Sequence, residues 1–146
     1  MPKIDVAIEN QFPKKVLPLI EAAKDFIDII VYDWRWYSKD PGASVQLFNQ
    51  SILRAVRRGV RVRVIVNDNG IFNILKGEGC QVKKLIFKGK VHCKMLIIDN
   101  QIVITGSHNY TASAFEINKE LSVILSGLDD VSPFVSYFNN LFNAYA

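Results

Sequence analysis

The stretch that decides the fold, residues 91–110, reads VHCKMLIIDNQIVITGSHNY. Two apolar runs flank the turn-forming dipeptide Asp99-Asn100, which is the pattern of a β-hairpin. A two-residue loop would place His92 opposite Ser107, whereas a three-residue loop would shift the pairing by one residue. The sequence allows both registers, and either one gathers the polar residues of this stretch into one small patch.

Polar side chains in this stretch are spaced two residues apart. His92 and Lys94 share one face of an extended strand, and Ser107 and Asn109 share a face in the same way. An imidazole, an ammonium, a hydroxyl and an amide together suit an anionic phosphodiester. Cys93 falls on the opposite face, so we expect it to be a small buried apolar residue and not a nucleophile.

The spacing of these residues resembles the HKD motif of the phospholipase D superfamily. The motif is complete and reads, in order, His92, Lys94, Asp99, Gly106, Ser107 and Asn109. The distal carboxylate of the family has a match in Glu120. With one motif per chain, the sequence is most similar to the small bacterial endonucleases of the superfamily.

The resemblance implies a catalytic role for five residues. His92 would attack phosphorus through Nε2 and form a phosphohistidine. Lys94 and Asn109 would hold the non-bridging oxygens, with Ser107 as a further donor. Glu120 would accept a hydrogen bond from His92 Nδ1–H and so fix the tautomer that attacks.

The mechanism that the resemblance implies needs a second histidine to protonate the leaving group. The only other one, His108, should point away from the Ser107–Asn109 face. It could line a substrate groove, or it could be an incidental polar residue. We therefore expect a homodimer in which two His92 side chains meet across a two-fold axis. Asp99 lies in the turn, so we expect a structural role for it.

Aromatic residues follow the strongly apolar strand expected over 26–32. Trp34, Arg35 and Trp36 are candidates for substrate contact, because rings beside a guanidinium can stack bases or cover phosphate. Core packing or dimer contacts explain these aromatics equally well. The chain has five arginines between residues 54 and 63. We expect them to lie on a solvated helix face and strand end, and binding of the DNA backbone is the less favoured alternative.

Alternating elements run along the rest of the chain. Strands are expected at 4–9, 60–66, 81–87 and 120–125 besides the hairpin, and helices at about 14–24, from Ser44 as N-cap to 56, at 71–76 and from 132 to an apolar stripe ending at Tyr145. This order predicts an α/β protein, an α-β-α sandwich with a mixed central sheet, formed by residues 1–146 as a single domain.

Composition fits an enzyme that acts on an anionic polymer. The 146 residues carry a net charge of +4, and the two cysteines and two histidines give no metal-ligand cluster, so no metal or other cofactor is expected. The N-terminus has no signal-peptide pattern, and no apolar run approaches a membrane span. These features predict a cytoplasmic protein without stable membrane association.

The expected function is a metal-independent phosphodiesterase, most simply an endonuclease that hydrolyses DNA, with RNA as a further substrate. The competing enzyme is a phospholipase or cardiolipin-type hydrolase, because the motif recognises the phosphodiester and not its substituents. A third interpretation is a catalytically silent module that binds nucleic acid.

Overall fold

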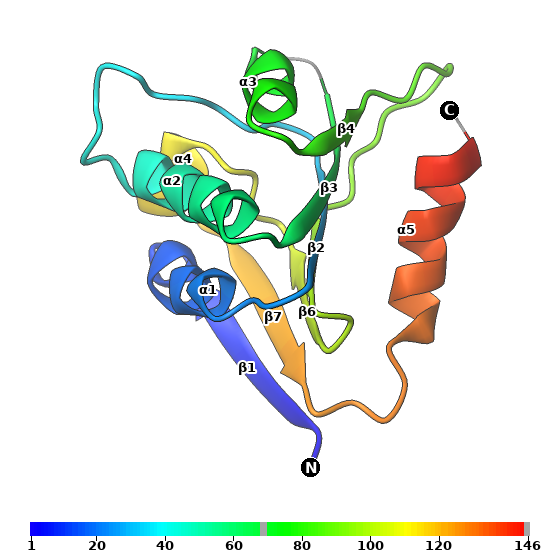
Figure 1. Cartoon of the computed structure of the whole chain (residues 1–146). Coiled ribbons are helices and arrows are strands. Elements are labelled where there is room, and N and C mark those ends of the chain that lie inside the picture. The colour runs from blue at the N-terminus through cyan, green and yellow to red at the C-terminus, as the bar shows by residue number, and fades with distance from the viewer. Residues whose placement is uncertain (68–69, 145–146) are drawn as a thin grey trace.

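A mixed β-sheet between two helical layers forms the centre of the molecule (Figure 1). The structure, a computed structural model, describes residues 1–67 and 70–144, so Tyr145 lies outside the described residues. The strands are β1 (Lys3–Ile8), β2 (Phe26–Val31), β3 (Arg61–Val66), β4 (Gln81–Lys83), β5 (Met95–Ile98), β6 (Ile102–Gly106) and β7 (Leu121–Ser126). The helices are α1 (Gln11–Glu21), α2 (Ser44–Arg57), α3 (Ile71–Gly77), α4 (Ala112–Glu116) and α5 (Ser132–Ala144).

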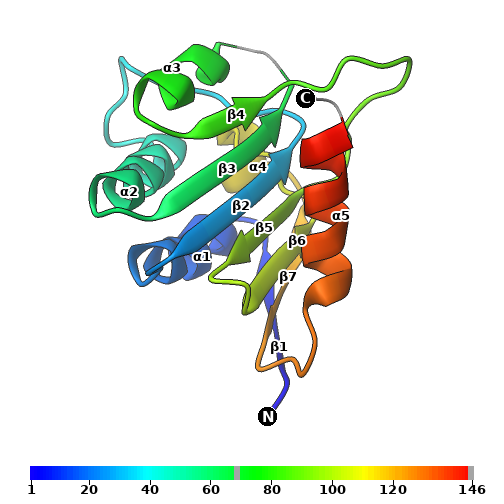
Figure 2. The same cartoon turned by 45° about the vertical axis from the view of Figure 1, so that its right-hand side comes forward.

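The strand order across the sheet is β1-β7-β6-β5-β2-β3-β4 within the described residues. Strands β2, β3 and β4 are parallel, whereas β5, β6, β7 and β1 pair antiparallel to their neighbours (Figure 2). Long crossovers through α2 and α3 connect the parallel strands, as parallel pairing requires. The predicted α/β sandwich with a mixed sheet is therefore confirmed.

The two helical layers are unequal. Helices α1, α2, α3 and α4 cover one face of the sheet, and α5 packs on the other (Figure 1). The larger core contains a cluster of three mutually packed rings, Trp34, Phe48 and Tyr110. The smaller core places Phe138 and Phe142 of α5 against apolar side chains of the central strands. Burying side chains of this size contributes about 1.5–3 kcal/mol each.

The hairpin adopts the three-residue loop, one of the two registers that the sequence allowed. Ile98 pairs with Ile102, and Met95 pairs with Thr105. Asp99 has φ +54° in this turn, a left-handed conformation that Asp and Asn tolerate better than other side chains.

Several boundaries differ from the prediction. Helix α1 begins at Gln11 and continues through Pro18, and Ala43, not Ser44, is the N-cap of α2. Helix α4 was not expected, because five residues are too few to show helical periodicity; the Thr111 side chain caps it by accepting from Ala114 N–H.

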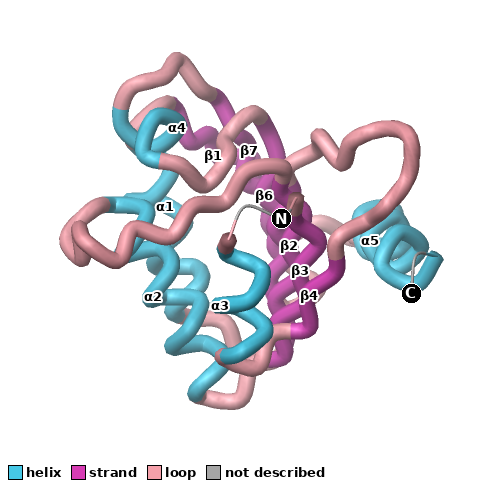
Figure 3. The backbone as a smooth tube through the Cα atoms, turned by 90° about the horizontal axis from the view of Figure 1, so that it is seen from above, coloured by secondary structure: helices cyan, strands magenta, loops and turns pink. Residues whose placement is uncertain are grey.

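The segment between β4 and β5 departs most from the prediction. Strand β4 ends at Lys83, and pairing resumes only at Met95, so residues 84–94 form an irregular segment that extends away from the sheet (Figure 3). His92 and Lys94 therefore precede the strand in which they were expected. A Lys-rich, Gly-containing stretch has little β-propensity, which accounts for the early end of β4.

Candidate active site

The motif residues gather at the carboxyl end of β2. The backbone N–H of Asp33 donates to Asn109 Oδ1 at 3.1 Å, and the Tyr32 ring lies 5.6 Å from the His92 ring, centroid to centroid. A β-bridge joins Trp34 to the residue after Asn109. The chain just after β2 therefore touches both ends of the motif, at the edge of the sheet where α/β proteins place their sites.

Tyr32 and Asp33 were not among the site residues expected from the sequence. Their position was the available signal, because they directly follow the apolar strand whose carboxyl end faces the motif. Their contacts make them a structural bridge between His92 and Asn109.

His92 and Lys94 differ sharply in exposure. His92 is exposed, whereas Lys94 keeps only 9% of its surface accessible. The Thr105 hydroxyl donates to the Lys94 carbonyl at 2.7 Å, which fixes the backbone just before β5. The Lys94 side chain lies toward the larger core, beside Phe12 and Tyr110. The motif thus combines an accessible histidine with a nearly buried lysine two residues later, and these two residue types can attack and hold an anion.

Glu120 has partners other than the one expected. Its Oε1 accepts from the Ser107 hydroxyl at 2.5 Å, and its Oε2 accepts from Asn118 Nδ2 at 3.1 Å. Within residues 1–67 and 70–144, no hydrogen bond joins Glu120 to His92. Ser107 Oγ in turn accepts from Leu121 N–H at 3.0 Å. The Ser107 hydroxyl has one proton, so in this structure it serves the carboxylate and is not free for a phosphate oxygen.

His108 does not line a substrate groove, which corrects its assignment as a candidate binding residue. It is 1% exposed, its ring stacks on Phe12 at 4.4 Å, and its two nitrogens contact Ser122 Oγ and the Glu9 carbonyl. Burial lowers the pKa of His108, although the Glu9 carbonyl and the charge of Glu120 oppose that shift. The side chain points away from the Ser107–Asn109 face, as expected. Because it is buried, it also cannot serve as the second histidine that protonates the leaving group within one chain.

The aromatic candidates are corrected in part. Trp34 is fully buried, and its indole N–H donates to Asn49 Oδ1, so it cannot contact substrate. Trp36 is partly buried and packs against the larger core. Arg35 is exposed and pairs with Asp33 at 2.7 Å. Core packing, one of the alternatives considered above, therefore accounts for the tryptophans.

Cys93 is exposed, so the expectation of a buried apolar residue was wrong. The cause is the irregular backbone before β5, which leaves the Cys93 side chain outside the packed sheet. It lies next to Tyr137 of α5; partial burial and the Cys93 side chain raise the pKa of this tyrosine above its usual value.

Asp99 has the structural role expected of it. Its carboxylate accepts backbone N–H groups from Lys24, Asp25 and Phe26 at 2.7–2.9 Å. Burial alone would raise the pKa of Asp99, but these three bonds outweigh it and hold the pKa below the usual value. The carboxylate thereby ties the hairpin turn to the start of β2, at the end of the sheet away from His92.

The arginines of residues 54–63 are exposed at positions 54, 57, 58 and 61, as the predicted solvated helix face and strand end require, whereas Arg63 is largely buried. Arg63 forms a nearly buried ion pair with Asp28 at 2.8 Å, and Arg58 donates to the Ile20 and Ala23 carbonyls. These groups lie at or near the amino ends of β2 and β3, away from the motif.

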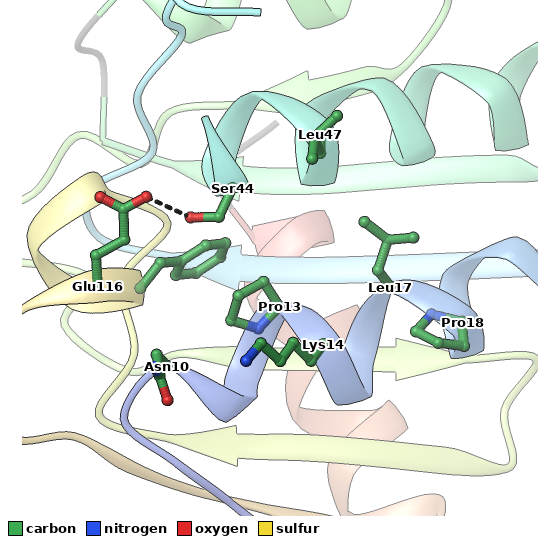
Figure 4. Close-up of a pocket in the computed structure, with 9 residues that line it drawn as sticks. Asn10, Pro13, Lys14, Leu17, Pro18, Ser44, Leu47 and Glu116 are labelled. Carbon is green, nitrogen blue, oxygen red and sulfur yellow. Dashed lines mark hydrogen bonds between the residues drawn. The ribbon is translucent and has the colours of Figure 1, made fainter. Parts of the chain in front are cut away.

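A cleft of about 460 Å³ between α1, α2 and α4 contains none of the motif residues (Figure 4). Pro13, Leu17 and Leu47 line it, and the Ser44 hydroxyl donates to Glu116 at its rim. In the part of the chain that the structure describes, no three His, Cys, Asp or Glu side chains group as metal ligands. No described helix is both long and apolar enough to cross a bilayer.

Comparisons with known proteins show the family of this chain. Residues 16–142 match the family model described as "Cardiolipin synthase, PLD-like domain". The chain is 28% identical over 137 residues to the mouse mitochondrial cardiolipin hydrolase, covering 90% of this chain and 58% of that protein. It is 31% identical over 116 residues to a phospholipase D of Rickettsia conorii, covering 75% and 56%. The chain thus spans just over half the length of these two relatives.

A solved structure agrees over the whole fold. Nuc from Salmonella typhimurium, titled a phospholipase D family member, superposes with a TM-score of 0.84 at 22% identity. The superposition covers 98% of this chain and 95% of that one.

Proposed function

The chain belongs to the family of phospholipase D-like domains, and on this premise we propose that it is a metal-independent endonuclease of DNA or RNA. As a member of the superfamily it is a phosphodiesterase. The single observation that carries the nucleic-acid assignment is the segment leading into the motif. This segment carries three exposed lysines, Lys84, Lys88 and Lys90, of which Lys90 lines the same cleft as His92, so a polyanion crossing the site would meet positive charge.

The reaction proceeds in two displacements. His92 Nε2 attacks phosphorus, the P–O bond to the leaving group breaks, and an acid protonates that oxygen. Water then attacks the phosphohistidine, transfers a proton to the group that acted as acid, and frees His92. Lys94 and the Asn109 amide hold the non-bridging oxygens, so the charge on them is stabilised in both steps. The Asp33 N–H bond to Asn109 Oδ1 leaves the Asn109 NH₂ group for the phosphate.

Glu120 and Ser107 act as a pair. The carboxylate holds the Ser107 hydroxyl, and rotation of that hydroxyl toward the phosphate would let it donate there while Glu120 turns to an imidazole. Both residues therefore belong to the proposed catalytic set, because a change of partner by one residue frees the other.

A second copy of the chain supplies the acid. Two exposed apolar residues, Ile8 and Leu121, pair across β1 and β7 next to Glu120, and the exposed Ile117 follows α4 nearby. An apolar patch beside the site supports a two-fold contact there, with His92 and the partner's His92 over one phosphate. One imidazole must be neutral and the other protonated, so substrate breaks the symmetry.

The test is hydrolysis of plasmid, single-stranded DNA, RNA and labelled cardiolipin vesicles, each with EDTA present. Nuclease activity that survives EDTA and disappears in His92→Ala is the expected result. Loss of activity on chelation, with recovery on adding magnesium, would contradict the mechanism.

A mixing experiment tests the shared site. When subunits exchange, equal amounts of wild-type and His92→Ala chains should leave about one quarter of the wild-type rate, because only dimers of two wild-type chains keep both imidazoles. A decline to one half would indicate independent sites.

A lipid phosphodiester is the second candidate, favoured by the relatives named cardiolipin hydrolase and phospholipase D. Turnover of vesicles with a flat salt response would support it over the nuclease, whose binding should fall steeply with salt. Cytoplasmic placement stays a prediction.

A further inference from the structure

A cleft of about 360 Å³ opens beside His92, between the segment before β5 and helix α5. Its lining residues are Phe87, Lys90, Val91, His92, Cys93, Tyr137 and Leu141. We propose that this cleft binds one unpaired nucleobase of single-stranded DNA or RNA, next to the phosphate that His92 attacks. The proposal rests on the proposed nuclease function and names the substrate class of its site.

Two aromatic rings from separate elements line the cleft. Phe87 comes from the irregular segment and Tyr137 from α5, and they remain 44% and 50% exposed. Gly89 lets the Phe87 ring lie against the backbone, since a Cβ there would come within 2.8 Å of that ring. Half-exposed rings facing a cleft offer stacking surfaces that every base can use.

The polar groups of the cleft fit a base better than an acyl chain. The Tyr137 side chain interacts with that of Cys93, and both residues line the cleft together with His92. A base presents hydrogen-bonding groups at its edge, which such partners can satisfy. An acyl chain would leave a phenol, a thiol and an imidazole facing hydrocarbon, at a cost in desolvation.

A cation completes the subsite. Lys90 Nζ lies 6.0 Å from the centroid of the Tyr32 ring, and the His92 ring lies 5.6 Å from the same ring. Lys90 and His92 therefore lie near the same ring and line the same cleft, so Lys90 can pair with the phosphate that follows the bound base. Bases inside a duplex stack on each other and cannot enter such a cleft, so the geometry selects single strands.

Binding of a fluorescent single-stranded oligothymidylate tests the proposal. Anisotropy is measured in a Lys94→Met background, which prevents turnover, and KM is measured with active protein. Phe87→Ala and Tyr137→Ala should each weaken binding about 5- to 150-fold, while Tyr137→Phe keeps the ring and binds within a few-fold of the parent. The control is Ile86→Ala, an 84% exposed neighbour outside the cleft, which should bind like the parent. Equal binding by all variants would overturn the proposal.

Abasic oligonucleotides separate the cleft from the reaction. One abasic nucleotide next to the cleaved linkage should weaken oligonucleotide binding by the parent protein. It should cause no further loss of binding in Phe87→Ala. Base-dependent binding without cleavage of any oligonucleotide would support the cleft and refute the nuclease function. If the oligonucleotides are cleaved but the abasic nucleotide weakens binding equally in the parent and in Phe87→Ala, the base-binding role of the cleft is refuted and the nuclease function is not. If these variants instead slow hydrolysis of cardiolipin vesicles and leave oligonucleotide binding unchanged, the cleft takes an acyl chain and the proposal is wrong.

Discussion

Replacing Lys94 by methionine removes the one ammonium that the motif holds inside the protein. With 9% of its surface accessible, Lys94 acts from a region where water screens charge poorly. At an effective dielectric constant of about 20, two unit charges about 4 Å apart interact by about 4 kcal/mol. A loss of this size in the transition state lowers kcat/KM by about 10³-fold.

The assay is initial-rate hydrolysis of methyl p-nitrophenyl phosphate and of a labelled single-stranded oligonucleotide. Both substrates should lose rate equally, because Lys94 acts on the phosphodiester and not on its substituents. Lys24→Met is the matched control, since Lys24 is exposed and lies near the Asp99 turn at the far end of the sheet. Methionine nearly matches lysine in length, so circular dichroism should show an intact fold. A folded Lys94→Met protein within tenfold of wild type would refute the phosphate-holding role.

Three further predictions concern residues with defined partners. Asp99→Asn should lower the free energy of unfolding, measured in urea, by about 1.5–3 kcal/mol at pH 7, because an amide has one oxygen that can accept where the carboxylate has two. Because the pKa of Asp99 is lowered in the folded state, this stabilisation is fully present above about pH 3.9 and should vanish as the pH falls through the folded-state pKa. The lowered pKa of buried His108 means that protonation favours unfolding, so urea stability should fall as pH drops below about 6.5, and His108→Gln should flatten that slope. Glu120→Gln should lower kcat/KM about 10- to 150-fold with an unchanged melting temperature, and an unaltered rate would remove Glu120 from the catalytic set.

The parts of the fold that the sequence predicted are those with strong periodicity. The helical stripe of α2 repeats with the helical period, and the apolar run of β2 is short and rich in β-branched residues, which favours a strand. The Asp99 turn was also predictable, because few residues other than Asp, Asn and Gly accept its backbone conformation. The short helix α4 gave no such signal, and its cap depends on the single side chain of Thr111.

The sequence predicts which residues are candidates for the site, but it does not predict their surroundings. Spacing alone identified His92 and Lys94, since a motif depends on identity and order. Which side chain Glu120 would contact depends on the β6–β7 pairing, which brings Ser107 next to Leu121 and leaves no trace in local sequence. Exposure of Cys93 likewise depends on where β5 starts, and strand ends are poorly marked in sequence.

Two residues that were expected to contact substrate have buried side chains instead. These side chains hold neighbouring groups of the candidate site in place. His108 sits between Ser107 and Asn109, and its buried bonds to Ser122 and Glu9 anchor the backbone from the core side. Because neighbouring side chains alternate along extended chain, burying His108 turns the side chains before and after it outward.

Trp34 does the same for the facing segment. Its indole is held by Asn49 inside the core, which fixes the preceding Asp33 N–H that orients Asn109. A buried aromatic anchor on each segment therefore sets the distance between two active-site loops, and such anchors can be altered without touching substrate. Trp34→Phe keeps an aromatic ring in the core but loses part of the indole volume and the Asn49 bond, so it should disturb kcat more than substrate binding. That separation distinguishes a positioning residue from a contact residue, and sequence pattern alone could not make it.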